Sequence, residues 1–188
     1  MFAKRCRGIA VILLLALLLC SCGKKDFDPQ QVAEHYAQSG FSTQYTVTTH
    51  AGFYEEYQLC CEQQNDLSTV TILQPESVAG ISAVLQEGDV KLQYEDLSLD
   101  ALLPEAAGYA PMDVLHGLLE DLRAGDPENW GMESDLLTLE YKTTLTDGSE
   151  TLKILTLQAE TLDLLSAECY LDNSLILAVQ VESWQWNS

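Results

Sequence analysis

The stretch Leu165–Val181, which reads LSAECYLDNSLILAVQV, decides the fold. In its first half, Leu165–Leu171, every second residue is apolar and the residues between them are mostly polar. In its second half, Leu175–Val181, every second residue is again apolar. A period of two is typical of a strand with one buried face, and the polar residues Asp172–Ser174 between the halves are typical of a turn. The stretch therefore predicts an antiparallel hairpin.

Runs of the same kind continue along the chain on both sides of this hairpin. The further predicted strands are Phe41–Thr49, Phe53–Glu62, Leu67–Leu73, Gly80–Leu85, Val90–Tyr94, Leu137–Thr143 and Thr151–Gln158. The segment Leu97–Gly108 reads as a looser connection. Trp184 and Trp186 lie on the opposite parity from Val181, so a β-bulge or an exit from the sheet is expected near Glu182. The two tryptophans suit either core packing or an exposed docking patch.

Two helices interrupt the strands. Asp28 and Pro29 are typical of an N-cap and a first helical position, which predicts a short helix over Gln30–Gln38. Pro111 opens a second predicted helix, Met112–Ala124, with apolar residues at helical spacing. That apolar stripe consists of Met112, Leu115, Leu118, Leu119 and Leu122. It fits two roles, direct packing in the core or a lid over an apolar ligand cavity. The predicted fold class is α+β, with a strongly curved antiparallel sheet, a half-barrel, wrapping one or two short helices.

The N-terminus has the features of a targeting signal. Three positive charges precede the apolar run Ile9–Leu19, which is too short for a spanning helix of about 20 residues. The run ends in Leu19–Gly23, LCSCG, which resembles a bacterial lipobox. That resemblance implies diacylglycerol modification of Cys22 and cleavage before it; an ordinary secretory signal with a coincidental cysteine is the alternative. The expected organisation is a signal peptide over 1–21, the lipidated Cys22 and a tether over 22–29, and one domain over 30–188.

The cysteines beyond the signal do not form a disulfide framework, because Cys60, Cys61 and Cys169 are odd in number once Cys22 is acylated. Cys60 and Cys61 are neighbours on a predicted strand, so their side chains point to opposite faces and at most one could pair with Cys169. Three buried thiols, or partial pairing of Cys169 with one of the other two, are the alternatives.

Charge and motifs narrow the classes of function. The chain of 188 residues has 9 Lys and Arg against 29 Asp and Glu, a formal charge of -20. Loss of the three positive charges in 1–21 leaves -23, and such an acidic body repels nucleic acid. The sequence has no P-loop, no G-x-S-x-G elbow and no H-E-x-x-H, and its three histidines have no second ligand at metal spacing. We therefore expect no catalytic residues, no metal and no cofactor.

Three stretches carry a family resemblance: Phe41–Val47, Val70–Ile81 and Val90–Leu99 with the Pro111 helix that follows. Together with the lipobox, they make the chain resemble the LolA/LolB/LppX-type lipoprotein-carrier fold, and within it clostridial lipoproteins related to the germination lipoprotein GerS. The resemblance implies a curved sheet around helices, with a gap that holds acyl chains or is filled, and a function through binding and not through chemistry.

The expected function follows from these features. The chain is predicted to be a non-enzymatic lipoprotein, anchored to the extracytoplasmic face of the cell membrane through Cys22, whose domain binds an apolar ligand such as an acyl chain, or a protein partner. The alternative implied by the GerS resemblance is an accessory protein that positions or activates a spore-cortex or cell-wall amidase.

Overall fold

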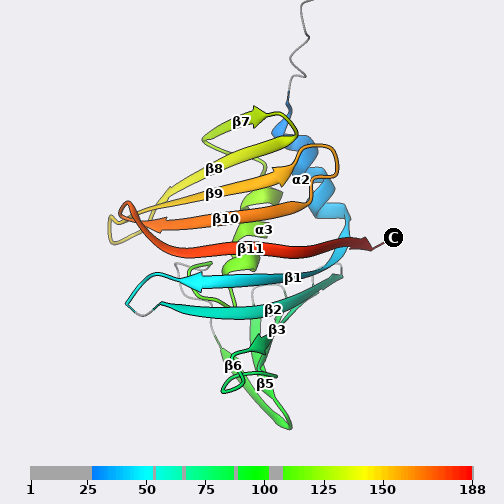
Figure 1. Cartoon of the computed structure of the whole chain (residues 1–188), viewed down its shortest axis with the longest axis vertical. Coiled ribbons are helices and arrows are strands. Elements are labelled where there is room, and N and C mark those ends of the chain that lie inside the picture. Colours follow the sequence, from blue (N-terminus) through cyan, green and yellow to red (C-terminus); the bar gives the residue numbers. More distant parts are fainter. Residues whose placement is uncertain (1–26, 53, 65–66, 87–88, 102–107, 188) are drawn as a thin grey trace, which may run out of the picture.

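The computed structural model describes residues 27–52, 54–64, 67–86, 89–101 and 108–187. Within these ranges the chain forms two helices and eleven strands. The elements are α2 (Pro29–Gln38), β1 (Gly40–Thr49), β2 (Glu55–Gln64), β3 (Leu67–Gln74), β4 (Ser82–Gln86), β5 (Asp89–Tyr94), β6 (Leu97–Ala101), α3 (Val114–Ala124), β7 (Asn129–Glu133), β8 (Leu136–Thr144), β9 (Glu150–Gln158), β10 (Leu164–Leu171) and β11 (Ser174–Asn187) (Figure 1).

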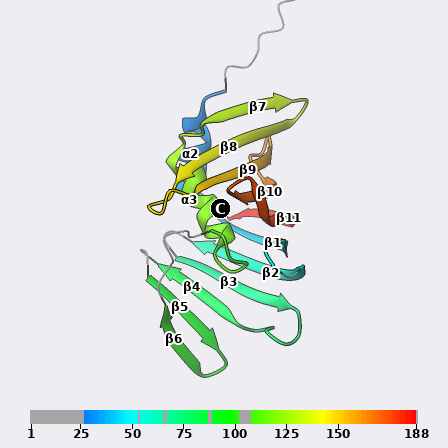
Figure 2. The same cartoon turned by 90° about the vertical axis from the view of Figure 1, so that its left-hand side faces the viewer.

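All eleven strands belong to one antiparallel sheet in the order β6-β5-β4-β3-β2-β1-β11-β10-β9-β8-β7. Hairpins build each half, and the pairing of β1 with β11 joins the two halves in the middle of the sheet. Both helices lie on the same face of the sheet, which curves around them (Figure 2). The expected α+β class with a curved antiparallel sheet is therefore confirmed. The half-barrel describes the sheet only in part, because the sheet is open and ends at β6 and β7.

The core lies between the helices and the concave face of the sheet. Every second residue is buried along β9 and over Leu137–Tyr141 of β8, including Leu137, Leu139, Leu155 and Leu157. The faces of these strands that point away from the helices are partly exposed, as an antiparallel sheet with one covered face requires.

Helix α2 begins and ends as its sequence predicts. The Asp28 side chain accepts a hydrogen bond from the Gln30 backbone N–H at 3.0 Å, and Pro29 occupies the first helical position. The helix contacts α3 through two long-range hydrogen bonds. Gln30 Nε2 donates to the Gly125 carbonyl at 3.0 Å, and Arg123 Nε donates to the Tyr36 carbonyl at 3.2 Å.

The predicted bulge in the last strand is confirmed. Gln44 pairs with Ser183 while the next residue, Tyr45, pairs with Val181, so Glu182 is the extra residue on β11. The bulge moves Trp184 and Trp186 to the helix side of the sheet. There the Trp184 ring stacks on Phe41 with centroids 4.3 Å apart, and Trp186 lies edge-on to Tyr36 at 5.1 Å. The tryptophans therefore pack against the core.

Two strands and the start of the second helix differ from the sequence-based expectation. The segment predicted as a loose connection contains a strand, β6, and a further strand, β7, precedes the predicted Leu137 strand. Both are edge strands with mostly exposed side chains, so neither has the alternation of buried and exposed residues that a strand with one covered face shows. Helix α3 begins at Val114, two residues later than predicted, because Met112 and Asp113 belong to the turn before it.

Candidate functional site

An apolar pocket of about 420 Å³ opens on the concave side, between strands β2–β6 and the turn that leads into α3. The strands and the β3–β4 connection contribute eight lining residues, and the segment before α3 contributes four. They are Tyr57, Ile72, Val78, Ala83, Leu85, Val90, Leu92, Ala101, Ala110, Pro111, Met112 and Asp113. In Figure 2, the strands β4, β5 and β6, which carry much of the pocket wall, extend beyond α3, and neither α2 nor α3 covers them.

The strand register explains why the wall of the pocket is apolar. Ala83 pairs with Leu92, and Leu85 pairs with Val90, so these four side chains share one face of the β4–β5 hairpin. Their neighbours in sequence on β5, Lys91 and Gln93, point to the other face and are exposed. The alternation that makes β5 a strand therefore also gives the pocket its apolar surface.

The apolar wall continues past the pocket to the edge of the sheet. Leu99 pairs with Leu92, and Leu97 pairs with Tyr94, so both leucines lie on the pocket side. Leu97 is 73% exposed and Leu99 is 66% exposed, although both are large apolar side chains. Exposed apolar surface that adjoins a pocket is typical of a binding site.

Among the described residues that line the pocket, Asp113 alone is charged. Its carboxylate accepts a hydrogen bond from the Ala110 backbone N–H at 2.8 Å. Burial raises the pKa of Asp113 above its ordinary value, and the backbone hydrogen bonds from Ala110 and Gly108 oppose that rise. Because the Asp113 carboxylate already accepts a hydrogen bond within its own turn, the surface that the pocket offers to a ligand is mainly apolar.

The predicted helix stripe is divided between the core and this pocket. Leu115, Leu118, Leu119 and Leu122 have no exposed surface and pack in the core. Met112, which lies just before the helix, lines the pocket and is only partly buried. The pocket residues on β3–β6 do not appear among the sequence-based candidates. The alternation Leu97, Leu99, Ala101 is the sequence signal that could have indicated them.

A buried ion pair fixes α3 to the sheet beside the pocket. Lys153 on β9 points into the core and is 9% exposed. Its Nζ atom lies 2.8 Å from Asp121 Oδ2, donates to the Gly117 carbonyl at 3.3 Å, and lies 5.5 Å from the centre of the Tyr109 ring. Burial raises the pKa of Asp121, while the charge of Lys153 opposes that rise. The alternation of Thr151, Lys153 and Leu155 places this lysine on the buried face, a signal that sequence reasoning missed.

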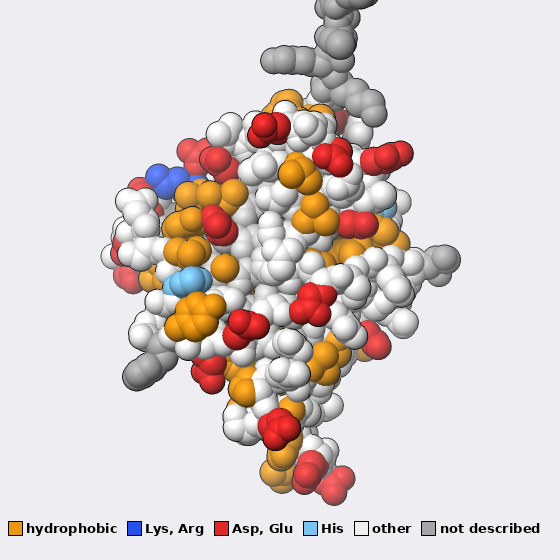
Figure 3. Space-filling model, viewed as in Figure 1, with side chains coloured by type: hydrophobic (Ala, Val, Ile, Leu, Met, Phe, Trp, Pro, Cys, Tyr) orange, Lys and Arg blue, Asp and Glu red, His pale blue; other side chains and the backbone are white. Residues whose placement is uncertain are grey.

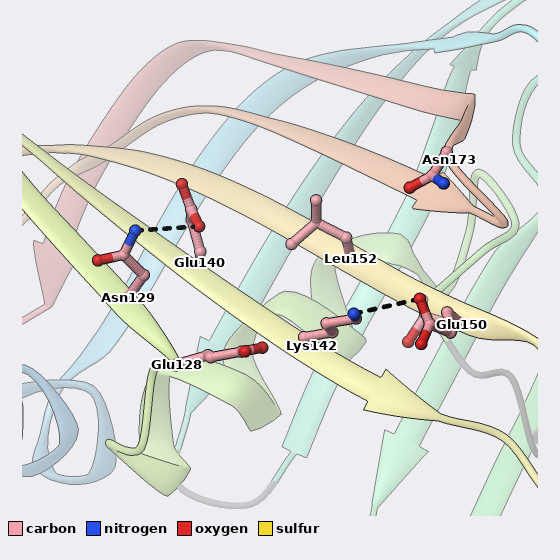
Figure 4. Close-up of a pocket in the computed structure, with 8 residues that line it drawn as sticks. Glu128, Asn129, Glu140, Lys142, Glu150, Leu152 and Asn173 are labelled. Atoms are coloured by element: carbon pink, nitrogen blue, oxygen red, sulfur yellow. Dashed lines mark hydrogen bonds and ion pairs between the residues drawn. The ribbon is translucent and has the colours of Figure 1, made fainter.

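A second hollow lies on the opposite, convex face of the sheet and is polar (Figure 4). Lys142 Nζ lies 3.1 Å from Glu150 Oε2, and Asn129 Nδ2 donates to Glu140 Oε2 at 3.3 Å. Carboxylates are spread widely over this face (Figure 3). Exposed ion pairs of this kind contribute little to stability, because water solvates both charges. The concave apolar pocket is therefore the better candidate for a ligand site.

The other residues that the sequence singles out are cysteines. Cys22 lies outside the described residues. Cys60, Cys61 and Cys169 are free thiols. Burial raises the pKa of Cys61 and of Cys169 to about 12, so both remain protonated at neutral pH. Within the described ranges, no group of three His, Cys, Asp or Glu side chains could hold a metal ion. No helix there is both long and apolar enough to cross a membrane.

Comparisons with known proteins give a likeness of fold. No protein-family model matches the chain, and no curated protein sequence matches it. A conserved, uncharacterised protein from Thermus thermophilus superposes with a TM-score of 0.52 at 11% identity, covering 85% of this chain and 86% of that one. A LolA superfamily protein from Nitrosomonas europaea gives 0.46 at 11% identity, covering 86% and 94%.

A third similar structure contains the GerS lipoprotein. It is the complex of the CwlD amidase from Clostridioides difficile with GerS, and it matches with a TM-score of 0.47 at 13% identity, covering 84% of this chain and 93% of that one. Of the three, only the Thermus protein exceeds a TM-score of 0.5. At 11% identity, the likeness to the Thermus protein concerns the fold alone.

Proposed function

We propose that this protein is a non-enzymatic, membrane-anchored lipoprotein of the extracytoplasmic face that binds an apolar ligand of the acyl-chain type in its concave pocket. The observation that carries the proposal is the pocket itself, walled by aliphatic side chains from β3–β6 and continued by the exposed Leu97 and Leu99. A molecule that removed these surfaces from water would gain roughly 25 cal/mol for each Å² of apolar area buried.

The size and chemistry of the pocket favour a hydrocarbon chain over a polar metabolite. Its volume of about 420 Å³ lies within the usual range of about 300–1,000 Å³ for ligand pockets. A polar ligand would need several unused polar groups aimed into the cavity, and the Asp113 carboxylate already accepts the Ala110 N–H. An acyl chain needs none of these groups, and a head group can remain in water at the open mouth.

The second part of the proposal is that a lipid on Cys22 anchors the domain to the membrane. Diacylglycerol on Cys22, with its acyl chains buried in the bilayer at about 0.8 kcal/mol for each CH₂, would hold the domain at the membrane. The charged start and apolar run of residues 1–19 and the LCSCG sequence at 19–23 support it.

A protein partner is a second candidate, and β6 is the observation that favours it. This strand is an edge of the sheet, and it presents Leu97 and Leu99 on the pocket side. An extended apolar segment of another protein could pair with this edge as a further strand and place side chains in the pocket. An accessory role toward a spore-cortex or cell-wall amidase, as predicted from the resemblance to GerS-related lipoproteins, would use such a surface.

The test of ligand binding is a titration with a fluorescent fatty acid. Leu92→Glu places a carboxylate in the apolar wall and should weaken probe binding at least about tenfold, because a buried unpaired charge is costly. Gln93→Glu is the matched control, since it adds the same charge to the neighbouring, exposed residue on the opposite face of β5. It should bind like the wild type. Absence of saturable binding to the wild type, or equal binding by both variants, would contradict the acyl-ligand proposal.

A further inference from the structure

The described chain begins beside one edge of the sheet. The ring of Phe27, which precedes α2, lies 4.9 Å from the ring of Trp130 on the edge strand β7, measured between centroids. Phe27 is partly buried against the core, so this contact fixes the place where the chain enters the domain. Cys22 precedes Phe27 by five residues, and an extended chain of that length spans at most about 18 Å.

The same edge carries exposed apolar and aromatic side chains. Trp130 is 43% exposed and Met132 is 42% exposed. They pair with Leu139 and Leu137 of β8, which are fully buried, so both lie on the core side of the sheet at its last strand. Among the described strands, none pairs with the outer side of β7. Apolar side chains reach the surface at the upper end of the molecule in Figure 3, the end at which Figure 1 shows β7.

From this placement we infer that the β7 edge, with Trp130 and Met132, contacts the head-group region of the bilayer that holds the lipidated Cys22. The inference rests on the lipid anchor of the proposed function. A tether of at most about 18 Å keeps the Phe27–Trp130 contact close to the membrane surface. Tryptophan has an apolar ring with one polar N–H and is enriched at the membrane–water interface, and the exposed Met132 adds apolar area beside it.

The charges at this end favour contact with neutral lipid. Glu128 precedes β7 and Glu133 ends it, and both are exposed carboxylates. A negative surface would repel them, so the contact depends on Trp130, Met132 and the tether and not on attraction to anionic head groups. Phosphatidylcholine vesicles, which carry no net charge, are therefore the appropriate probe.

This orientation places the pocket away from the membrane. From β7 to β4, whose Ala83 and Leu85 line the pocket, the sheet order gives eight strand spacings. At about 4.8 Å each, that is about 38 Å measured along the curved sheet. The pocket then lies at the end of the sheet farther from the bilayer that holds Cys22.

The experiment uses the full-length lipidated chain in vesicles of phosphatidylcholine brominated near the head of its acyl chains, which quenches nearby tryptophan fluorescence. The wild type should lose up to about one third of its emission, because Trp130 is one of three tryptophans. Trp130→Phe should abolish most of that loss. The double variant Trp130→Phe/Leu99→Trp moves the exposed tryptophan to β6, at the opposite edge of the sheet, where the side chain of residue 99 is also exposed. Bromine quenching should remain absent in this variant.

The outcomes separate this inference from the proposal on which it rests. Flotation with the vesicles should be seen for the wild type, and its N-terminal peptide should carry the mass of diacylglycerol on Cys22. A wild type that fails to float overturns the anchor and this orientation with it. A wild type that floats without bromine quenching, or whose quenching is unchanged in Trp130→Phe, overturns the orientation alone. Tryptophan emission that changes with the density of protein on the vesicle but not with bromine would indicate that a second copy of this chain contacts β7. That result would also overturn the orientation.

Discussion

Lys153→Met should destabilise the protein by about 3 kcal/mol at pH 7, because it leaves Asp121 as a charge without its partner beneath α3. Lys153 is almost wholly buried, and its Nζ atom lies 2.8 Å from Asp121 Oδ2 and 3.3 Å from the Gly117 carbonyl. Urea unfolding of wild type and variant measures the loss. The matched control is Lys142→Met, which breaks the 3.1 Å pair with Glu150 on the exposed convex face and should cost less than about 0.5 kcal/mol.

The pH dependence of this loss has a defined sign. Burial already raises the pKa of Asp121, and removal of Lys153 removes the charge that opposes the rise. A carboxyl whose pKa is raised by folding favours the folded state below its ordinary value of 3.8, and that contribution is lost as the pH rises through the raised pKa. The deficit of Lys153→Met should therefore shrink as the pH falls from 7 toward 4.

A double variant tests whether the unpaired charge is the cause. Lys153→Met/Asp121→Leu removes both charges and should recover most of the stability that Lys153→Met loses, because apolar pairs replace buried ion pairs at little cost. A double variant as unstable as Lys153→Met, or a deficit that does not change with pH, would show that Lys153 acts through packing instead.

Leu118→Ala should cost about 2–5 kcal/mol, because Leu118 is fully buried between α3 and the sheet and its truncation leaves a cavity. Fatty-acid binding should remain, since Leu118 does not line the pocket. The urea midpoint and the probe titration are measured on the same sample. A small change of midpoint would mean that α3 covers a space and does not pack directly on the sheet.

Met112→Ala is the counterpart on the pocket side. Met112 is partly buried and lines the pocket just before α3, so its truncation should lower probe affinity while costing less stability than Leu118→Ala. The two variants thus separate the two roles that the sequence leaves open for the helix stripe. Loss of stability with unchanged probe affinity in Met112→Ala would remove Met112 from the binding site.

The elements that local patterns specify well could be predicted from the sequence. The cap of α2 is formed by Asp28 alone with the Gln30 N–H, so two neighbouring residue types are enough to indicate it. The bulge at Glu182 follows from the changed parity of Trp184 and Trp186 within one strand. Each of these features depends on residues within a few positions of one another.

The edge strands could not be predicted in the same way. Every residue of β7 is exposed, and β6 buries no residue fully, so neither strand needs the alternation of one dry and one wet face. Their pairing with β8 and β5 comes from backbone hydrogen bonds, which most side chains permit. The sequence signal in Leu97, Leu99 and Ala101 was present, but a short exposed run also suits a loop.

The pocket depends on long-range pairing that no local pattern contains. Its walls come from five strands and from the turn before α3, and their position relative to α3 depends on the β1–β11 pairing in the middle of the sheet. The sequence indicated the apolar face of Val90–Tyr94 and the stripe of the second helix separately. It did not indicate that Met112, Leu92 and Ala83 line one pocket. Nor did it indicate that the four leucines of the stripe are buried in the core instead.

The most direct test of the central claim is mass spectrometry of the lipids extracted from the full chain after purification from bacterial membranes. The account predicts an acyl-chain molecule near one per protein in the wild type and in Gln93→Glu, in addition to the lipid attached to Cys22, and a strong reduction in Leu92→Glu. Urea midpoints establish first that all three proteins are folded. Equal amounts of lipid from Leu92→Glu and Gln93→Glu, or none beyond the covalent anchor in the wild type, would contradict the claim that the concave pocket is an acyl-chain site.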